Sequence, residues 1–221
     1  MFESRLKGPA RDCTLCPRLV GFREQNQAAY PSFHNAPVPS FAPPKASPAP
    51  WLLIVGLAPG LKGANQTGRP FTGDAAGDLL YAALLKHGLA VGTYGQSPKD
   101  GLTLVGCRIT NAVRCVPPEN KPIGAEVKAC RPFLVDEISA LHEVGLTHLL
   151  ALGGLSHGAI LAALGEKKSA YPFAHQACHR LTNGLTLVNS YHCSRYNTNT
   201  GRLTEAMFDA VFIDAIADRA A

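Results

Sequence analysis

The sequence has no run of apolar residues near the roughly 18 that a helix needs to cross a lipid bilayer. Its first eleven residues contain four charged side chains and no apolar core of the kind that secretory signals carry. We therefore expect a cytoplasmic protein that does not associate with membranes. A reducing compartment disfavours disulfides, so the seven cysteines are expected to bind metal or to pack in the core.

Known nucleotide-binding signatures are also missing. The glycine-rich segment 56–74 has neither the lysine–serine ending of a Walker loop nor the spacing of a dinucleotide fingerprint. No internal repeat is visible. The formal net charge of +5 is a mild excess. It suits a protein that meets a polyanion, but it does not identify one.

Apolar stretches alternate with segments of helical periodicity. The predicted strands are 51–55, 104–110, 147–152 and 185–189. The predicted helices are 17–29, 74–88, 130–141 (with Pro132 in its first turn), 154–164 and a last helix capped by Thr204. This alternation predicts an α/β fold with a central, mostly parallel, four-stranded sheet flanked by helices. The length fits a single domain over 1–221.

Seven prolines in residues 31–50 exclude a helix or an inner strand there, because proline fixes φ and lacks an N–H. We interpret this stretch as an extended arm that crosses the surface of the domain. Three unusual segments follow predicted strands: 56–74 after the first, 111–122 after the second and 191–204 after the fourth. Sites in parallel sheets lie beyond the carboxyl ends of strands, so these segments are expected to form one site.

Three side chains in these segments have two readings each. Phe71 is either a hydrophobic anchor for its loop or a plate that stacks on a planar ligand. Asp74 is an N-cap of the following helix, a catalytic carboxylate, or both. His192, directly after the fourth predicted strand, is either structural or a catalytic donor.

The segment 191–204 is polar and is expected to be a loop. Its hydroxyl and amide side chains suit contacts with phosphates, and Arg195 and Arg202 add positive charge.

Four cysteines have the features of metal ligands. Cys13 and Cys16 form a C-x-x-C pair ahead of the first strand, whereas Cys115 and Cys130 each adjoin a basic residue and a proline-marked turn. The spacing indicates a four-thiolate metal site and leaves zinc and an iron–sulfur cluster open. The alternative is that Cys115 and Cys130 are core residues, since free cysteine is often buried.

Five segments together closely resemble the uracil-DNA glycosylase superfamily, and most closely its type b (family 5) iron–sulfur branch. They are 56–60 (GLAPG), 67–74 (TGRPFTGD), 111–115 (NAVRC), 117–122 (PPENKP) and 192–204 (HCSRYNTNTGRLT). The resemblance spans nearly the whole chain. It implies a uracil-DNA-glycosylase-like fold and a [4Fe–4S] cluster on the four cysteines named above.

The resemblance also implies roles for site residues. Phe71 would stack on a flipped base, Asn111 would bind the base's Watson–Crick edge, and His192 with loop amides near Gly56 would stabilise charge on the departing base. The water-handling position of most members is filled by Leu57 and Ala58, so Asp74 is the expected substitute. Further expected contacts with substrate or DNA are Asn120, Asn197, Arg69, Ser194, Arg195 and Arg202.

The implied activity is hydrolytic removal of uracil from DNA in base excision repair, with hypoxanthine and xanthine as further substrates. The expected partner is double- or single-stranded DNA that contains deaminated bases, bound by a monomer. The apolar Leu57 and Ala58 motivate an alternative: a non-catalytic iron–sulfur protein that binds damaged or single-stranded DNA. An electron carrier is disfavoured, because it would have no use for the loops around Phe71 and His192.

Overall fold

A computed structural model of the chain describes residues 6, 8–45 and 47–220. Glu3, Arg5 and Lys7, on which the expectation about a secretory signal partly rests, lie outside the described residues, as do position 46 of the proline-rich arm and position 221. No helix in the described part of the chain is both long and apolar enough to span a membrane.

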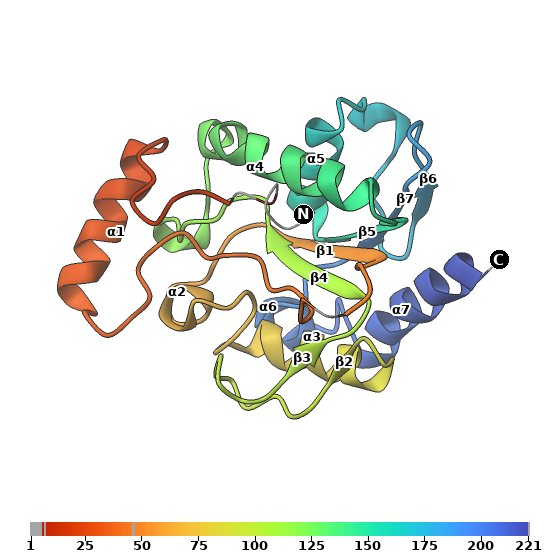
Figure 1. The fold of residues 1–221 in the computed structure, drawn as a ribbon, viewed down its shortest axis with the longest axis horizontal. Helices are drawn as coiled ribbons and strands as arrows, with labels where there is room; N and C mark the ends of the chain where they lie inside the picture. The colour runs from red at the N-terminus through yellow and green to blue at the C-terminus, as the bar shows by residue number, and fades with distance from the viewer. Residues whose placement is uncertain (1–5, 7, 46, 221) are drawn as a thin grey trace.

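The centre of the molecule is a five-stranded sheet in the order β4-β1-β5-β7-β6 (Figure 1). Its strands are β1 (Leu52–Gly56), β4 (Cys107–Asn111), β5 (His148–Leu152), β6 (Cys178–Arg180) and β7 (Thr186–Ser190). β4, β1, β5 and β7 are parallel, and β6 pairs antiparallel with β7 at the edge. The predicted mostly parallel α/β sheet is confirmed with its four strands. The sequence did not predict β6, which has three partly exposed residues and no apolar pattern.

Helices cover both faces of this sheet, with α4 and α5 on one side and α3 and α7 on the other (Figure 1). The helices are α1 (Pro17–Ala29), α2 (Ala64–Thr67), α3 (Ala75–Lys86), α4 (Gly124–His142), α5 (Gly154–Ala163), α6 (Arg195–Asn199) and α7 (Glu205–Ala220), and short 3₁₀ turns occur at Pro118–Asn120 and Lys168–Ala170. The predicted cap of α7 is confirmed, because the Thr204 hydroxyl accepts the Met207 N–H at 3.2 Å.

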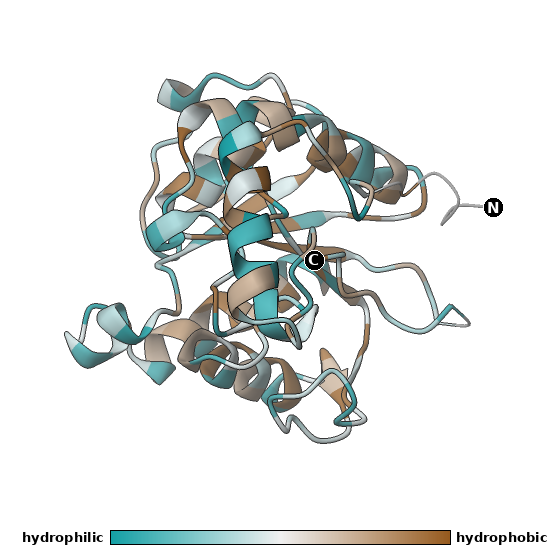
Figure 2. Ribbon diagram, turned by 90° about the vertical axis from the view of Figure 1, so that its left-hand side faces the viewer, coloured by the Kyte–Doolittle hydropathy of each residue, from teal (hydrophilic) through white to brown (hydrophobic). Residues whose placement is uncertain are grey.

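The continuous apolar runs of the strands follow from this two-sided cover. In β1, Leu52 and Ile54 belong to the hydrophobic cluster under α3 and α7, whereas Leu53 and Val55 belong to the cluster under α4 and α5. Successive side chains of a strand point to opposite faces, so both faces need apolar residues. In Figure 2, hydrophobic and hydrophilic residues alternate along the helices that cover the sheet.

The second predicted strand, 104–110, is two strands in the structure. Its beginning belongs to β3 (Thr103–Leu104), which pairs antiparallel with β2 (Ala90–Val91), and its end is β4. Gly106 separates them with φ +63, a left-handed conformation that favours glycine. A Cβ at that position would lie 2.8 Å from the Trp51 indole nitrogen.

Three local expectations are wrong. Pro132 lies inside α4 and not in its first turn. The helix starts at Gly124, eight positions before Pro132, because the Glu126 carboxylate accepts the Ile123 N–H at 2.9 Å. The segment 191–204 contains the short helix α6, capped by Ser194. The described residues of the proline-rich arm, 31–45 and 47–50, form no helix, as predicted. The arm does not simply cross the surface, however, since residues 35–38 are buried and Phe41 bridges to β4.

A buried ionic network joins α4 to β4. The Glu137 carboxylate accepts from Arg108 and Arg114, each at 2.6 Å, and from the Thr110 hydroxyl at 2.9 Å. Burial on its own raises the pKa of Glu137, but the two guanidinium groups outweigh it and hold this pKa at about 2. The network fixes the end of β4, where Asn111 projects towards the site.

Replacing Glu137 by glutamine should lower the free energy of unfolding by about 3–5 kcal/mol, because two buried guanidinium groups lose their counterion. The depressed pKa of Glu137 also sets the sign of the pH dependence. Its contribution to stability is complete above the ordinary glutamate pKa of about 4.5 and is lost as pH falls towards 2. Urea unfolding of both proteins at pH 7 and pH 3 measures this. A variant equally destabilised at both pH values would contradict it.

Candidate active site

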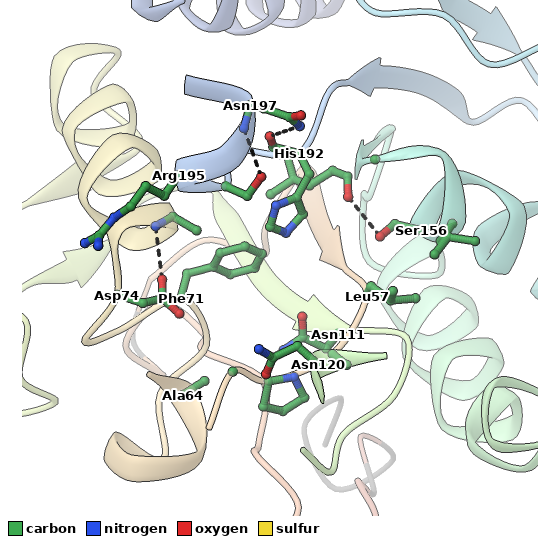
Figure 3. A pocket seen from close by; sticks show the side chains of 18 of the residues that line it. Leu57, Ala64, Phe71, Asp74, Asn111, Asn120, Ser156, His192, Arg195 and Asn197 are labelled. Atoms are coloured by element: carbon green, nitrogen blue, oxygen red, sulfur yellow. Dashed lines mark hydrogen bonds between the residues drawn. The ribbon is translucent and has the colours of Figure 1, made fainter. Parts of the chain in front are cut away.

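A cavity of about 880 Å³ opens at the carboxyl ends of the parallel strands (Figure 3). The three segments that were expected to meet do line it together, which confirms that part of the prediction. A fourth segment, 152–156 at the end of β5 and the start of α5, also lines it, and so does Phe173. The sequence carried a signal for this segment, because the Gly153–Gly154 pair directly follows the third predicted strand.

The structure brings together most of the predicted site residues. The cavity is lined by Phe71, Asp74, Asn111, Asn120, His192, Ser194, Arg195, Asn197 and Arg202. Gly56 lies directly behind the wall formed by Phe71 and Asn111, where an added Cβ would overlap the Asn111 amide oxygen and the Phe71 ring. Only a glycine at the end of β1 lets these two side chains approach so closely.

The Phe71 ring and the Asn111 amide lie next to each other in the cavity wall, so an apolar ring face adjoins a polar group. Phe71 has φ +52 and is 7% exposed, and its ring centroid lies 6.0 Å from that of His192. The Asn111 oxygen Oδ1 is buried without a hydrogen-bond partner within the described residues. A buried acceptor of this kind is costly unless a donor forms a hydrogen bond to it. In Figure 3, Phe71, Asn111 and His192 point towards a common space.

Asp74 is the N-cap of α3, as predicted. Its Oδ1 accepts the N–H groups of Ala76 and Gly77, both at 3.1 Å. Its Oδ2 makes no hydrogen bond among the described residues and faces the glycine loop, where a Cβ on Gly60 would lie 3.2 Å away. One carboxylate oxygen therefore holds the helix, and the other stays available at the cavity wall.

His192 enters the cavity from the end of β7. Burial lowers the pKa of its imidazole, and the negative charge of Asp74 only partly opposes this effect. The neutral form is therefore favoured at pH 7. Its carbonyl accepts the Asn197 side-chain amide at 2.8 Å, so Asn197 fixes the turn that carries the ring. Neither ring nitrogen is hydrogen-bonded within the part of the chain that the structure describes.

Arg69 does not reach the cavity, and its expected role in DNA binding is corrected. Its guanidinium forms two hydrogen bonds to the Asp100 carboxylate, at 2.8 and 2.6 Å, and lies over the rings of Phe41, Tyr81 and Tyr94. The Arg69 side chain is 6% exposed. The ion pair holds the pKa of Asp100 well below its usual value. Arg69 therefore anchors the Phe71 loop from behind.

The four predicted metal ligands gather at a second, much smaller cavity. Cys13, Cys16, Cys115 and Cys130 all line it, and all four are free thiols. Burial raises the pKa of Cys115 to about 12, with a further increase from the nearby Cys130. No three histidine, cysteine, aspartate or glutamate side chains in the described residues are grouped so that they could hold a single metal ion. Four thiols are the kind of donor that zinc and iron–sulfur clusters bind.

Comparison with known proteins identifies the family. The model of the uracil DNA glycosylase superfamily matches residues 43–216. The chain belongs to the uracil-DNA glycosylase superfamily. Within it, the chain is similar to the type-5 uracil-DNA glycosylases of Thermus thermophilus (45% identity, covering 92% of each chain), Mycobacterium leprae (42%, covering 92% of this chain and 90% of the relative) and Pyrobaculum aerophilum (37%, covering 94% and 89%).

Proposed function

We propose that this member of the superfamily removes uracil from DNA by hydrolysing the bond between base and deoxyribose. The observation that carries the proposal is the buried Asn111 Oδ1, which has no hydrogen-bond partner among the described residues and lies at the same cavity as Phe71 and His192. Each of the type-5 relatives named above is a uracil-DNA glycosylase. Hypoxanthine and xanthine are further proposed substrates, since about 880 Å³ leaves room for a purine.

Base binding follows from the cavity walls. A base inside a duplex is out of reach, so it must first leave the stack. Phe71 then offers its ring face, and such base–aromatic stacking is worth about 1–3 kcal/mol per base. The Asn111 amide would hydrogen-bond the Watson–Crick edge of the base. Asn120, on the 3₁₀ turn after β4, also lines the cavity and is a second amide contact.

The chemistry is assigned to Asp74 and His192. Cleavage leaves positive charge on the sugar and negative charge on the base. The Asp74 Oδ2 would stabilise the cationic sugar and position the attacking water. The neutral His192 imidazole, together with amides near Gly56, would donate hydrogen bonds to the oxygen of the departing base. Asp74 would position the water because the apolar side chains of Leu57 and Ala58 cannot do so.

DNA would approach over the rim of the cavity. Ser194, Arg195 and Arg202 lie there on the segment that follows β7, and both arginines are exposed. Contacts of these residues with phosphates would position the duplex or single strand without reading its sequence. We propose that the protein binds DNA as a monomer in the cytoplasm.

The second cavity is proposed to hold a [4Fe–4S] cluster on Cys13, Cys16, Cys115 and Cys130. Cys13 and Cys16 precede α1, Cys115 follows β4, and Cys130 belongs to α4. When bound, the cluster would cross-link these three segments. Cys115 lies four positions after Asn111, so its role is to brace the strand end that reads the base.

Replacing Cys115 by serine should remove most of the iron and lower the thermal unfolding midpoint. The matched control is Cys178→Ser, because Cys178 is an exposed thiol outside the second cavity. Iron and acid-labile sulfide per protein, together with the unfolding midpoint, measure the effect. Full iron content in Cys115→Ser would exclude this cysteine as a ligand.

The proposed activity is tested by base release from matched duplexes that contain uracil, hypoxanthine or xanthine. We expect free uracil and an abasic site that alkali cleaves. DNA binding without release of any base, from protein with its metal centre intact, would instead identify a non-catalytic binder of damaged DNA.

A further inference from the structure

Arg202 is an exposed arginine that lies over an aromatic ring at the active-site cavity. Its guanidinium carbon lies 4.6 Å from the centroid of the Tyr191 ring, and both side chains line the active-site cavity. Arg202 makes no hydrogen bond or ion pair within the described residues, so the ring is its main partner. A guanidinium that lies on a ring face keeps its N–H groups available for hydrogen bonds to another group.

Arg69 provides an internal comparison. It also lies over aromatic rings, but its N–H groups are consumed by Asp100 and by the Thr72 hydroxyl, at 2.8 Å. That arrangement is closed and needs no ligand. The stack at Arg202 is open, since the guanidinium lies on a ring and forms no ion pair with any carboxylate in the part of the chain that the structure describes. A planar fork of free donors suits a phosphate group.

Tyr191 is itself held in place. Its ring stacks on His175, with centroids 5.0 Å apart and an interplanar angle of 16°, and Phe173 lies at 6.2 Å. The Tyr191 N–H also donates to His175 Nδ1 at 3.1 Å. The ring that supports Arg202 is therefore held in place by contacts with the body of the protein.

We propose that Tyr191 is a positioning residue that holds the Arg202 guanidinium ready to bind one phosphate of the DNA backbone. Arg202 would otherwise be a flexible side chain at the rim, and ordering it on binding would cost free energy. The inference rests on the proposed function only in that the ligand is DNA.

The test measures DNA affinity by fluorescence anisotropy over a series of KCl concentrations. The probe is a duplex with one 2′-fluorodeoxyuridine, whose fluorine disfavours cleavage by destabilising positive charge on the sugar. The variants are Arg202→Gln, Tyr191→Leu, Tyr191→Phe and the double variant Tyr191→Leu/Arg202→Gln. Tyr171→Leu is the matched control, because the Tyr171 ring contacts the His179 ring edge-on and does not line the cavity.

Log affinity falls as log salt rises, and each lost phosphate contact makes this negative slope shallower by about 0.9. This is the result expected for Arg202→Gln. Tyr191→Leu should also make the slope shallower, by up to about 0.9, and should weaken DNA binding by about two- to fivefold. Tyr191→Phe keeps the ring and should restore the slope. The double variant should bind no more weakly than Arg202→Gln, and the Tyr171→Leu slope should match that of the unsubstituted protein.

Three results would overturn the inference: an unchanged slope in Tyr191→Leu, additive losses in the double variant, or a Tyr191→Phe variant as weak as Tyr191→Leu. Circular dichroism and thermal unfolding show whether each variant is folded. Base release assayed on the unsubstituted protein separates the two proposals. Without release, the glycosylase assignment fails, yet the salt slopes still decide the role of Tyr191, because binding alone produces them.

Discussion

Asp74→Asn should release uracil about 10²- to 10⁴-fold more slowly than the unsubstituted protein, the range associated with loss of a positioned acid–base group. Asparagine is nearly isosteric with aspartate and caps helices about as well. Its amide oxygen can still accept the N–H groups of Ala76 and Gly77. The substitution therefore removes the negative charge and leaves the start of α3 intact. Single-turnover rates with excess protein measure the effect on chemistry.

Asp74→Ala is the companion variant, because it removes both the charge and the cap. It should be as slow as Asp74→Asn and, in addition, less stable by about 0.5–2 kcal/mol. Asp74→Asn should keep its unfolding midpoint and its affinity for DNA. A normal rate in Asp74→Asn, with a loss of stability in Asp74→Ala, would mean that Asp74 is only a helix cap.

His192→Gln should reduce the single-turnover rate by about 10²- to 10³-fold, as removal of one donor to a developing oxyanion does. Burial lowers the pKa of His192, so its neutral form acts near pH 7. A histidine whose pKa is lowered by folding resists protonation in the folded state. The free energy of unfolding is therefore highest at pH values above the ordinary histidine pKa of about 6.5, and it decreases as the pH falls below that value. The unsubstituted protein should thus lose more stability between pH 7 and pH 5 than His192→Gln does.

His142→Gln is the matched control, because His142 is exposed at the end of α4 and does not line the cavity. It should keep both the rate and the pH dependence of the unsubstituted protein. Equal rates for His192→Gln and His142→Gln would remove His192 from the chemistry.

Much of the site was predictable because it follows from chain order. Strand and helix alternate, so the segments after parallel strands converge at one edge of the sheet, and Phe71, Asn111 and His192 each stand directly in such a segment. The cap formed by Asp74 was predictable for a similar reason: it is a local contact between a side chain and the next turn of backbone.

Features that depend on distant partners were not predictable. Arg69 stands in a motif full of site residues, and nothing nearby in the sequence shows that Asp100 and three rings will enclose it. The start of α4 was misplaced because the apolar periodicity from Cys130 onward is stronger than the polar first turn around Glu126. β6 exists because its neighbour β7 offers an edge, and its own three residues carry no pattern.

The loop that carries Phe71 and Asp74 is fastened from several sides. Arg69 ties one end to Asp100, the Tyr94 hydroxyl donates to the Phe71 carbonyl at 3.3 Å, and Asp74 caps α3 at the other end. Folding itself therefore restricts this loop, and little of its freedom remains to be lost when a base arrives. The stacking ring and the carboxylate would meet each substrate at a fixed separation. Selectivity among bases would then depend on which base fits the fixed space between the Phe71 ring and the Asp74 carboxylate.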